Sequence, residues 1–355
     1  MVLQSTGRIS LSNVQTEFGG TNPILLSEYF ANSATGYTTG VTGIPNSTTN
    51  PSTSIKLSQF YGKAKQIILT ETVYNFNYTG TIQSLILPAT AKHISVDLNG
   101  ASGSAGRQPE MGYDGGLGGK LVASNISVTG GTTIYIVVGC VGISPGGARY
   151  GGGGGGYTAV MNDTTPSIAT WFACAGGGGG GGSAIYVSNP FIGGSPGENG
   201  GTNYVTSNSS LTVGAGGISD VNGSAGTATG GGNGGSTSGS NTAGGGGGGG
   251  SYGLNGGSGG IGGGNYSSTN AGGIGGYGGG GGGGGNGVGS NLARVCPGGG
   301  GGGGYIGGNG GYCNTTNGGQ GGRGGYNYMI STGTLISTGS RTNTGNGSAT
   351  ITVYS

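Results

Sequence analysis

The chain has 355 residues, of which 101 are glycine, and its 11 basic and 9 acidic residues give a net charge of +2. This length allows two or more structural units. The charges form no clustered basic face of the kind that nucleic-acid binding needs, and no apolar stretch approaches the length of a membrane span. We therefore expect neither a nucleic-acid partner nor membrane insertion.

Residues 1–66 carry a degenerate repeat in which a short apolar piece leads into a serine and, in the last two copies, an aromatic residue. The three copies are Ile9–Ser12, Ile24–Phe30 and Ile55–Tyr61. Each copy predicts an extended piece followed by a short helical turn, which Ser12, Ser27 or Ser58 caps. A linker rich in Ser, Thr, Asn, Gly and Pro, residues 31–54, separates the last two copies. We interpret residues 1–66 as an attachment segment that orders against another protein.

Residues 67–145 form the most conventional region, which we predict to be a β-strand domain. Their β-branched residues and partial alternation indicate strands at Ile67–Val73, Ile82–Leu87, His93–Leu98, Lys120–Val128 and Thr133–Val138. One more strand, Ala349–Tyr354, closes the chain within residues 346–355. We expect the first and last strands to share a sheet and to complete a small β-sandwich-like frame.

Residues 146–345 contain five uninterrupted glycine runs. The runs are Gly151–Gly156, Gly176–Gly182, Gly244–Gly250, Gly278–Gly285 and Gly298–Gly304. Glycine has no side chain to bury, and it is destabilising inside a helix or a strand. The runs are therefore either disordered, as glycine-rich linkers are, or packed through their backbone atoms.

The segments between the runs favour packing, because their side chains keep a spacing of three. Residues separated by two glycines are Asn255, Ser258 and Ile261; Ala271, Ile274 and Tyr277; Ile306, Asn309 and Tyr312; and Asn317, Gln320, Arg323 and Tyr326. The polyproline II helix has three residues per turn and no internal hydrogen bonds. Its amides point sideways and must find partners in neighbouring segments.

The predicted fold is therefore mostly β plus polyglycine II. A β-sandwich-like frame clamps a bundle of packed polyglycine II helices, with the all-glycine runs inside and every third side chain of the other segments pointing outward. The interior scaffold positions of this prediction are Gly151, Gly179, Gly247, Gly281 and Gly301.

The chain has four cysteines, Cys140, Cys174, Cys296 and Cys313. They lack the close pairs of a zinc site. Free thiols are the simpler expectation, while a Cys296–Cys313 or a Cys140–Cys174 disulfide stays open. The single tryptophan, Trp171, lies in a predicted strand, Ser167–Ala175, between two glycine runs. We expect it in a core rather than in a ligand site.

Four sequence stretches carry a family resemblance. They are Asn99-Gly-Ala-Ser-Gly, Gly118-Gly-Lys-Leu-Val-Ala, Thr129-Gly-Gly-Thr-Thr-Ile-Tyr-Ile-Val-Val and Gly345-Asn-Gly-Ser-Ala-Thr-Ile-Thr-Val. With the glycine runs and the hairpin at 157–175, they make about four fifths of the chain similar to the glycine-rich domain of phage tail-fibre adhesins and other surface proteins. The resemblance implies that the runs form polyglycine II helices. A related domain occurs in certain animal receptor kinases, so the domain alone does not determine the function.

The N-terminal stretch from Ile9 to Ile24, together with Ile55-Lys-Leu-Ser-Gln-Phe-Tyr-Gly, resembles the N-termini of virion proteins in marine tailed phages. This resemblance implies that residues 1–66 attach to other tail or fibre proteins. The chain departs from some fibre-tip adhesins, because it has no tryptophan-rich attachment domain.

Few residues could support catalysis. His93 is the only histidine, and we expect it to be a surface or structural residue. The acidic residues follow no glycosidase motif. The sequence around Lys120 fails as a phosphate-binding loop, because Asp114 and Leu121 replace the required glycine and hydroxyl residues. We expect a non-enzymatic protein without a cofactor or a metal.

The leading interpretation is a virion surface protein that recognises a host surface protein or glycan. A backbone-packed bundle tolerates varied loops on a rigid base. The receptor-binding candidates in the predicted loops are Tyr113, Tyr186, Tyr204, Tyr252 and Tyr266. Tyrosines beside asparagine and serine suit adaptable polar recognition, although packing over the outer helices would explain them equally well.

The alternative is a structural virion component, such as a fibre, sheath or capsid decoration protein, without receptor recognition. Residues 1–10 lack the apolar core of a secretory signal, which fits a particle that assembles in the host cytoplasm. Homo-oligomerisation stays open at this point.

Overall fold

The structure is a computed structural model, and its C-terminal part is mostly β. It describes residues 3–6, 8–23, 25–30, 38, 41, 44, 55–63, 70–107, 112–144, 150–164, 170–183, 197–201, 204–205, 214–217, 222–227, 230–236, 244–250, 254–258, 272–284, 297–314, 318–342 and 344–355. The chain divides into two compact units, Met1–Leu69 and Thr70–Ser355.

The N-terminal unit has a hydrophobic core of its own. Its regular elements are helix α1 (Leu11–Phe18) and the 3₁₀ turns η1 (Leu26–Tyr29) and η2 (Leu57–Phe60). The ring of Phe60 makes edge contacts with Phe18 and Tyr29, at centroid distances of 5.8 and 6.0 Å. The buried residues are Leu3, Val14, Phe18, Tyr29, Val41, Ile44, Ile55 and Phe60. These eight residues therefore form a core within the unit itself, although Leu25 is 53% exposed.

The predicted serine caps are wrong by one or two residues. Helix α1 is capped by Ser10 rather than Ser12: the Ser10 hydroxyl accepts the Asn13 N–H at 3.3 Å, and the Asn13 side chain accepts the Ser10 N–H at 2.9 Å. Ser27 and Ser58 lie inside their turns instead of before them. Each turn begins one residue earlier, at a leucine that packs against the core.

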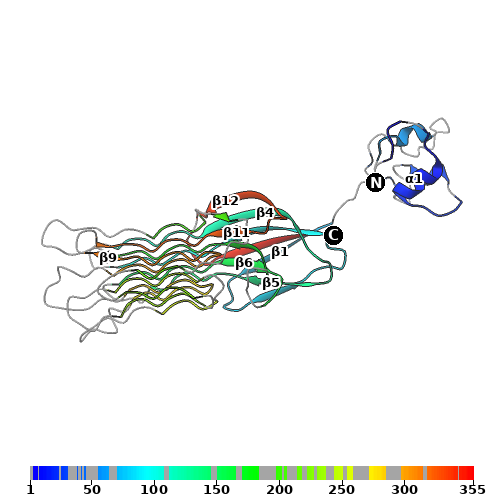
Figure 1. Ribbon diagram of the computed structural model, residues 1–355. Helices are drawn as coiled ribbons and strands as arrows, with labels where there is room; N and C mark the ends of the chain where they lie inside the picture. The colour runs from blue at the N-terminus through cyan, green and yellow to red at the C-terminus, as the bar shows by residue number, and fades with distance from the viewer. Residues whose placement is uncertain are drawn as a thin grey trace, which may run out of the picture. The chain divides into compact units, whose positions relative to one another are not determined.

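The C-terminal unit holds two sheets, drawn in Figure 1. The strands are β1 (Glu71–Asn77), β2 (Gln83–Ile86), β3 (His93–Asn99), β4 (Gly119–Ser127), β5 (Thr133–Val137), β6 (Thr158–Met161), β7 (Trp171–Ala175), β8 (Tyr204–Val205), β9 (Cys313–Asn314), β10 (Gly318–Gly319), β11 (Asn327–Met329), β12 (Thr334–Ser340) and β13 (Ser348–Tyr354). One sheet has the order β1-β13-β3-β4-β12 and the other β2-β5-β6-β7-β11-β8. All pairs are antiparallel except β11 with β8, and β9 and β10 form a separate pair.

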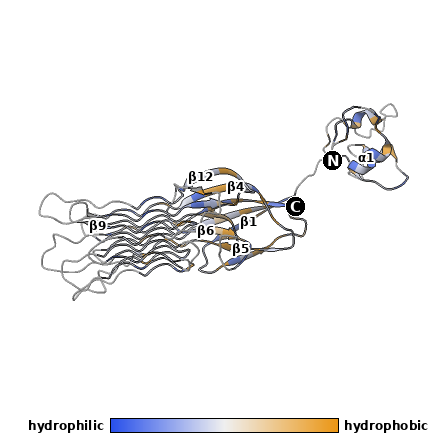
Figure 2. Cartoon of the chain, viewed as in Figure 1, coloured by the Kyte–Doolittle hydropathy of each residue, from blue (hydrophilic) through white to orange (hydrophobic). Residues whose placement is uncertain are grey.

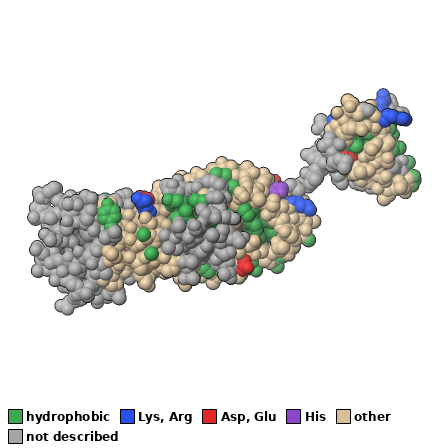
Figure 3. All heavy atoms as spheres, in the orientation of Figure 1, with side chains coloured by type: hydrophobic (Ala, Val, Ile, Leu, Met, Phe, Trp, Pro, Cys, Tyr) green, Lys and Arg blue, Asp and Glu red, His purple; other side chains and the backbone are tan. Residues whose placement is uncertain are grey.

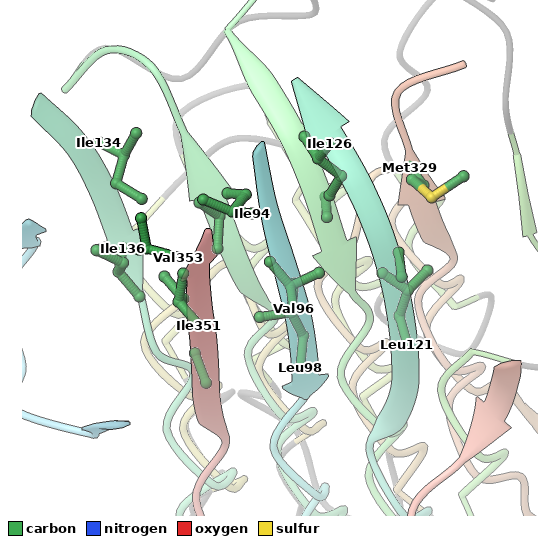
Figure 4. Packing of buried hydrophobic residues seen from close by; sticks show 14 of the residues in the cluster. Ile94, Val96, Leu98, Leu121, Ile126, Ile134, Ile136, Met329, Ile351 and Val353 are labelled. Atoms are coloured by element: carbon green, nitrogen blue, oxygen red, sulfur yellow. The ribbon is translucent and has the colours of Figure 1, made fainter. Parts of the chain in front are cut away.

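Residues from both sheets share one hydrophobic cluster. Every second residue of β3 and β13 is buried, as their alternating sequences require. Figure 4 shows Ile94 and Ile351 from the first sheet in the same cluster as Ile134 and Ile136 from β5. The inner faces of the two sheets therefore hold the frame together through side-chain burial.

The predicted strands at 82–87, 93–98, 120–128, 133–138 and 349–354 are confirmed within one or two residues. The first and last strands pair directly, Tyr74 opposite Ile351. The first strand begins four residues later than expected, at Glu71, and its Tyr74 and Phe76 pack against the core. Residues 67–69 lie outside the described residues. The sequence did not indicate β11 and β12, which lie in the region predicted as bundle.

The glycine segments continue directly from strand ends, and Figure 1 shows them running side by side away from the sheets. We call these segments the glycine bundle: 100–107, 112–118, 139–144, 150–156, 176–183, 197–201, 214–217, 222–227, 230–236, 244–250, 254–258, 272–284, 297–312 and 320–326. Because β1 and β13 are hydrogen-bonded neighbours, the bundle is not clamped between them. The frame holds it through covalent continuity, through a hydrophobic cluster and through hydrogen bonds from Asn327. Figure 2 shows the hydrophobic residues concentrated on the strands.

A second hydrophobic cluster joins the six-stranded sheet to the bundle. Trp171 is buried there, 5.0 Å from the ring of Tyr157 and 6.0 Å from Tyr305, measured between centroids. This confirms the expected core role of the tryptophan. Cys174 lies in the same cluster as a free thiol, and its burial raises its pKa well above the ordinary value. Cys140 is also free, so these two cysteines form no disulfide; Cys296 lies outside the described residues.

The shared core between the sheets predicts that alanine replacements of a buried and an exposed isoleucine change the stability of the protein by very different amounts. Replacing Ile351, which is fully buried in β13, by alanine should lower the free energy of unfolding by about 2–5 kcal/mol. Ile86 in β2 is 73% exposed, and the same replacement there should change it by less than about 0.5 kcal/mol. Denaturant unfolding of both variants measures this, and equal losses would contradict the assigned core.

Candidate functional site: the glycine bundle and its far end

The glycine runs are the buried interior of the bundle. Every described residue of the five runs is buried, including Gly151, Gly179, Gly247, Gly281 and Gly301. In the segments with a spacing of three, the intervening side chains lie toward solvent. Ile274 and Tyr312 are 46% and 45% exposed, and Asn309 is also exposed. The prediction of an all-glycine interior is confirmed for these runs, and the outward third residue is confirmed for Ile274, Asn309 and Tyr312. It is wrong for Tyr277 and Ile306, which are half-buried and pack against the hydrophobic cluster around Trp171.

Backbone hydrogen bonds within the bundle repeat every third residue. In the run Gly298–Gly304, the N–H groups of Gly298, Gly301 and Gly304 all donate to one neighbour, segment 244–250. The bond from Gly301 N to Gly247 O is 2.9 Å long. The remaining N–H groups of this run donate to two further segments, so that successive residues bond in three different directions.

The run Gly298–Gly304 bonds to six neighbouring segments in total. Its N–H groups donate to segments 244–250, 320–325 and 150–156, and its carbonyls accept from 278–284, 307–311 and 176–182. The run Gly176–Gly182 also bonds to neighbours on several sides. The Gly179 N–H donates to Glu198 O at 2.9 Å, and the Gly179 carbonyl accepts the N–H of Gly116 at 2.7 Å. At Gly179 and Gly301, both backbone polar groups therefore find lateral partners, as buried amides require.

This packing leaves no room for a side chain at the interior positions. A Cβ atom on Gly301 would lie 1.9 Å from the carbonyl oxygen of Gly308, and one on Gly281 would lie 2.2 Å from that of Gly247. The corresponding distances at Gly151, Gly179 and Gly247 are each 2.0 Å, also to a carbonyl oxygen. The atoms in the way are backbone atoms, which a rotamer change cannot move. Glycine is therefore required at these positions by contact distance.

Asparagine side chains supply hydrogen bonds where a neighbouring backbone carbonyl is missing. The Oδ1 atoms of Asn309 and Asn233 each accept a backbone N–H from an adjacent segment, of Ala215 and Ser258 respectively, both at 2.9 Å. Asn199 does the same for Leu117 at 2.8 Å. Sequence reasoning assigned these asparagines no role, although their place in the three-residue spacing is a usable signal.

Asn327 forms the junction between the bundle and both sheets. Its side chain is fully buried, and its Oδ1 accepts the N–H of Gly176 at 2.8 Å. Its Nδ2 donates to Lys120 O in β4 and to the hydroxyl of Thr338 in β12, both at 2.8 Å. One amide thus satisfies the first N–H of an interior run while bonding two strands of the opposite sheet.

The bundle has a sheet end and a far end. Gly176 directly follows β7 at the sheet end, and Ser183 lies at the far end, where its N–H donates to Pro297 O at 3.3 Å. Arg107 and Tyr150 pair at the same end. The described residues flanking eight further stretches of chain also lie there. These stretches are 108–111, 145–149, 184–196, 218–221, 237–243, 259–271, 285–296 and 315–317.

The receptor-binding candidates do not share one location. Tyr113 is half-buried near the far end, where its carbonyl accepts the N–H of Gly106 at 2.9 Å. Tyr204 lies in β8, opposite Asn327 of β11, so it belongs to the six-stranded sheet and not to a far-end loop. That placement corrects the prediction for Tyr204: a parallel strand pair between distant segments leaves little trace in so short a sequence.

The other three candidates, Tyr186, Tyr252 and Tyr266, lie outside the described residues. The residues flanking Tyr186 and Tyr266 lie at the far end. Those flanking Tyr252 lie at the sheet end instead: Gly250 donates to Gly279 O, and Leu254 O accepts from Gly278, both at 2.8 Å. Of the five candidates, the described residues therefore place only Tyr113 near the far end and Tyr204 in a sheet.

The described surface offers little reactive chemistry. The ring of His93 stacks on Tyr354 at a centroid distance of 4.6 Å. Within the described residues, no three His, Cys, Asp or Glu side chains are grouped as metal ligands would be, and no helix has the length and apolarity to cross a membrane. On the bundle, Arg323 and Glu198 form an exposed ion pair at 3.7 Å. The face in Figure 3 is mostly backbone and uncharged side chains.

Comparisons with known proteins add no family assignment. No protein-family model matches the chain, and a search of curated proteins found no match.

Backbone packing in the bundle predicts an unusually costly alanine substitution. Gly301→Ala should lower the free energy of unfolding by at least about 3 kcal/mol, because the new methyl group collides with the carbonyl of Gly308. Gly339→Ala in β12 is the matched control: a Cβ there meets nothing within 4 Å, so the change should stay within about 0.5 kcal/mol. Thermal and denaturant unfolding test both, and a harmless Gly301→Ala variant would refute the packing.

The buried amide of Asn327 at the junction predicts that its replacement by alanine destabilises the protein more than the replacement of an exposed asparagine does. Asn327→Ala should cost about 3 kcal/mol or more, because buried groups on Gly176 and Lys120 lose their partners. Asn309→Ala removes one exposed hydrogen bond and should cost less than about 1.5 kcal/mol. Amide hydrogen exchange provides a second readout: Gly176 should exchange faster in the Asn327 variant only.

Proposed function

We propose that the glycine segments are polyglycine II helices, packed as a bundle on a β-sandwich frame. The repeat of three in the hydrogen bonds and the six neighbours of an interior run support this assignment, since a helix with three residues per turn directs its amides along three lateral directions. Neighbours run in both directions: segment 244–250 is parallel to the run Gly298–Gly304, and segment 176–182 is antiparallel.

We further propose that the protein is a non-enzymatic virion surface protein, a phage tail or tail-fibre adhesin whose far end binds a host surface protein or glycan. The observation that carries this proposal is that the described residues flanking eight connecting stretches lie at the end opposite the sheets. Because the interior glycine runs contain no side chains, we expect sequence changes in these stretches to leave the packing of the runs intact. That combination of a rigid base and free sequence suits recognition.

The N-terminal unit takes the role of attachment to other tail or fibre proteins in this proposal. It has its own core, so it can fold as a separate module before it meets a partner. Its resemblance to the N-termini of tailed-phage virion proteins supports the same role.

The test compares replacements at the two ends of the bundle in assembled particles. Residues 184–196, flanked by far-end residues, are replaced by a Gly/Ser stretch of equal length, and residues 206–213, flanked by sheet-end residues, receive the same treatment as the control. We expect the first replacement to lower the adsorption rate to host cells at least tenfold and the second to leave it unchanged, with both proteins unfolding at the parental temperature.

Normal adsorption after replacement of all eight far-end stretches would contradict the adhesin role. Labelling the chain in imaged particles distinguishes the adhesin from a structural virion component, because a few copies at a tail or fibre tip fit an adhesin. Hundreds of copies along a tube or over a shell would instead identify a structural component.

A further inference from the structure

A row of polar side chains crosses the five-stranded sheet where it meets the bundle. Ser348 of β13 is opposite Asn99 of β3, which is opposite Lys120 of β4. Their neighbours in sequence, Leu98 and Leu121 among them, are buried in the core between the sheets. Since side chains alternate along a strand, the polar row lies on the outer face of this sheet.

The end of β12 and the residues after it complete a cavity over this row. The cavity has a volume of about 330 Å³ and is lined by Asn99, Lys120, Ser340, Arg341, Thr342 and Ser348. Pockets for small molecules begin at about 300 Å³. The cavity thus has room for a ligand of the size of one sugar unit. It lies at the sheet end of the bundle, so its occupancy does not depend on the role proposed for the far end.

The cavity concentrates positive charge. Lys120 and Arg341 are two of the five basic residues that the structure describes between residues 70 and 355. One carboxylate, Asp97, lies beside them, 3.2 Å from the Lys120 Nζ. Two cations against one anion leave an excess charge of +1. This ion pair is about 40% exposed on each side, so the Lys120 ammonium remains accessible to a ligand.

Arg341 is held rigidly and still has donors to offer. Its Nη1 donates to the carbonyls of Gly100 and Asn346, at 3.1 and 2.6 Å, with a longer contact of 3.5 Å to Gly345 O, and its Nη2 donates to Thr344 O at 3.3 Å. A guanidinium group has five N–H donors. Among the described residues, the Nε–H has no acceptor and Nη2 has one, so one Nε and one Nη2 hydrogen remain. An Nε–H together with a neighbouring Nη–H forms the kind of fork that binds a carboxylate through two parallel hydrogen bonds.

The remaining lining supplies groups that match sugar hydroxyls. The Asn99 amide donates to the hydroxyl of Ser348 at 3.2 Å, and the Ser340 hydroxyl donates to Gly200 O at 3.1 Å. Both hydroxyl oxygens keep acceptor capacity, and Thr342 adds an exposed hydroxyl. No aromatic side chain lines the cavity, so it lacks the stacking surface on which a nucleobase would bind.

We propose that this cavity binds an acidic monosaccharide unit, with the carboxylate on Arg341 and Lys120 and the sugar hydroxyls on Asn99, Ser340, Thr342 and Ser348. Another cavity among the described residues, about 410 Å³ beside Phe172, has no charged lining residue and fits no such ligand. The ligand class follows from both features of the cavity. A simple inorganic anion would use only the positive charge, and a neutral sugar would use only the hydroxyl groups.

The test is titration calorimetry of the full chain with sodium D-glucuronate, D-glucose and sodium sulfate. We expect saturable binding of glucuronate, and affinities for glucose and for sulfate that are at least tenfold weaker. Lys120→Gln should weaken glucuronate binding at least tenfold. Lys92→Gln is the matched control, because Lys92 is an exposed lysine outside the cavity, and it should bind glucuronate like the parent chain.

Arg341 anchors four carbonyls, so its variants are checked for an intact fold before they are titrated. Ser348→Ala and Thr342→Val test whether the cavity binds the sugar hydroxyls. Each should weaken glucuronate binding and leave sulfate binding unchanged. Absence of saturable glucuronate binding, or an equal loss in the Lys92 and Lys120 variants, would overturn the site. Equal affinities for sulfate and glucuronate would overturn its assignment to a saccharide.

Discussion

The lateral hydrogen bond between glycine backbones is the interaction on which the C-terminal unit depends. Neighbouring segments approach until a Cβ atom would lie about 2 Å from a carbonyl oxygen, as at Gly281 and Gly301. Each bond contributes about 0.5–1.5 kcal/mol, while ordering a residue costs about 1–2 kcal/mol. An isolated segment therefore gains too little to form. Order becomes favourable when a run has neighbours on all sides, as Gly298–Gly304 has.

A bundle of this kind needs a nucleus that fixes the position of its first segments, and the two sheets provide it. Their shared core forms by ordinary side-chain burial, and several segments leave directly from strand ends. Asn327 then satisfies the first N–H of an interior run and ties it to β4 and β12. The frame thus contributes the hydrophobic free energy that glycine cannot, and the bundle contributes length without side chains.

The two ends of the bundle have different surroundings, and this difference organises the proposed functions. The residues that flank eight connecting stretches lie at the far end, for which we propose variable recognition. The sheet end carries the cavity around Lys120 and Arg341, whose position in the strand register is invariant to changes at the far end. An adhesin with both features would combine a recognition surface that can change with a saccharide site that is built into its frame.

The sequence by itself determined the strands of the β-rich frame and the glycine interior, because alternation, β-branched residues and a spacing of three are local signals. It also determined that Ile274, Asn309 and Tyr312 face outward. Only the tertiary structure decided which connections lie at which end, so that Tyr204 became a strand residue and the neighbours of Tyr252 lie beside the sheets. It also decided the role of Asn327 and the grouping of Lys120 with Arg341. The direction of each glycine segment depends on hydrogen bonds to residues far away in the chain. The glycine sequence alone does not show which segments those partners belong to.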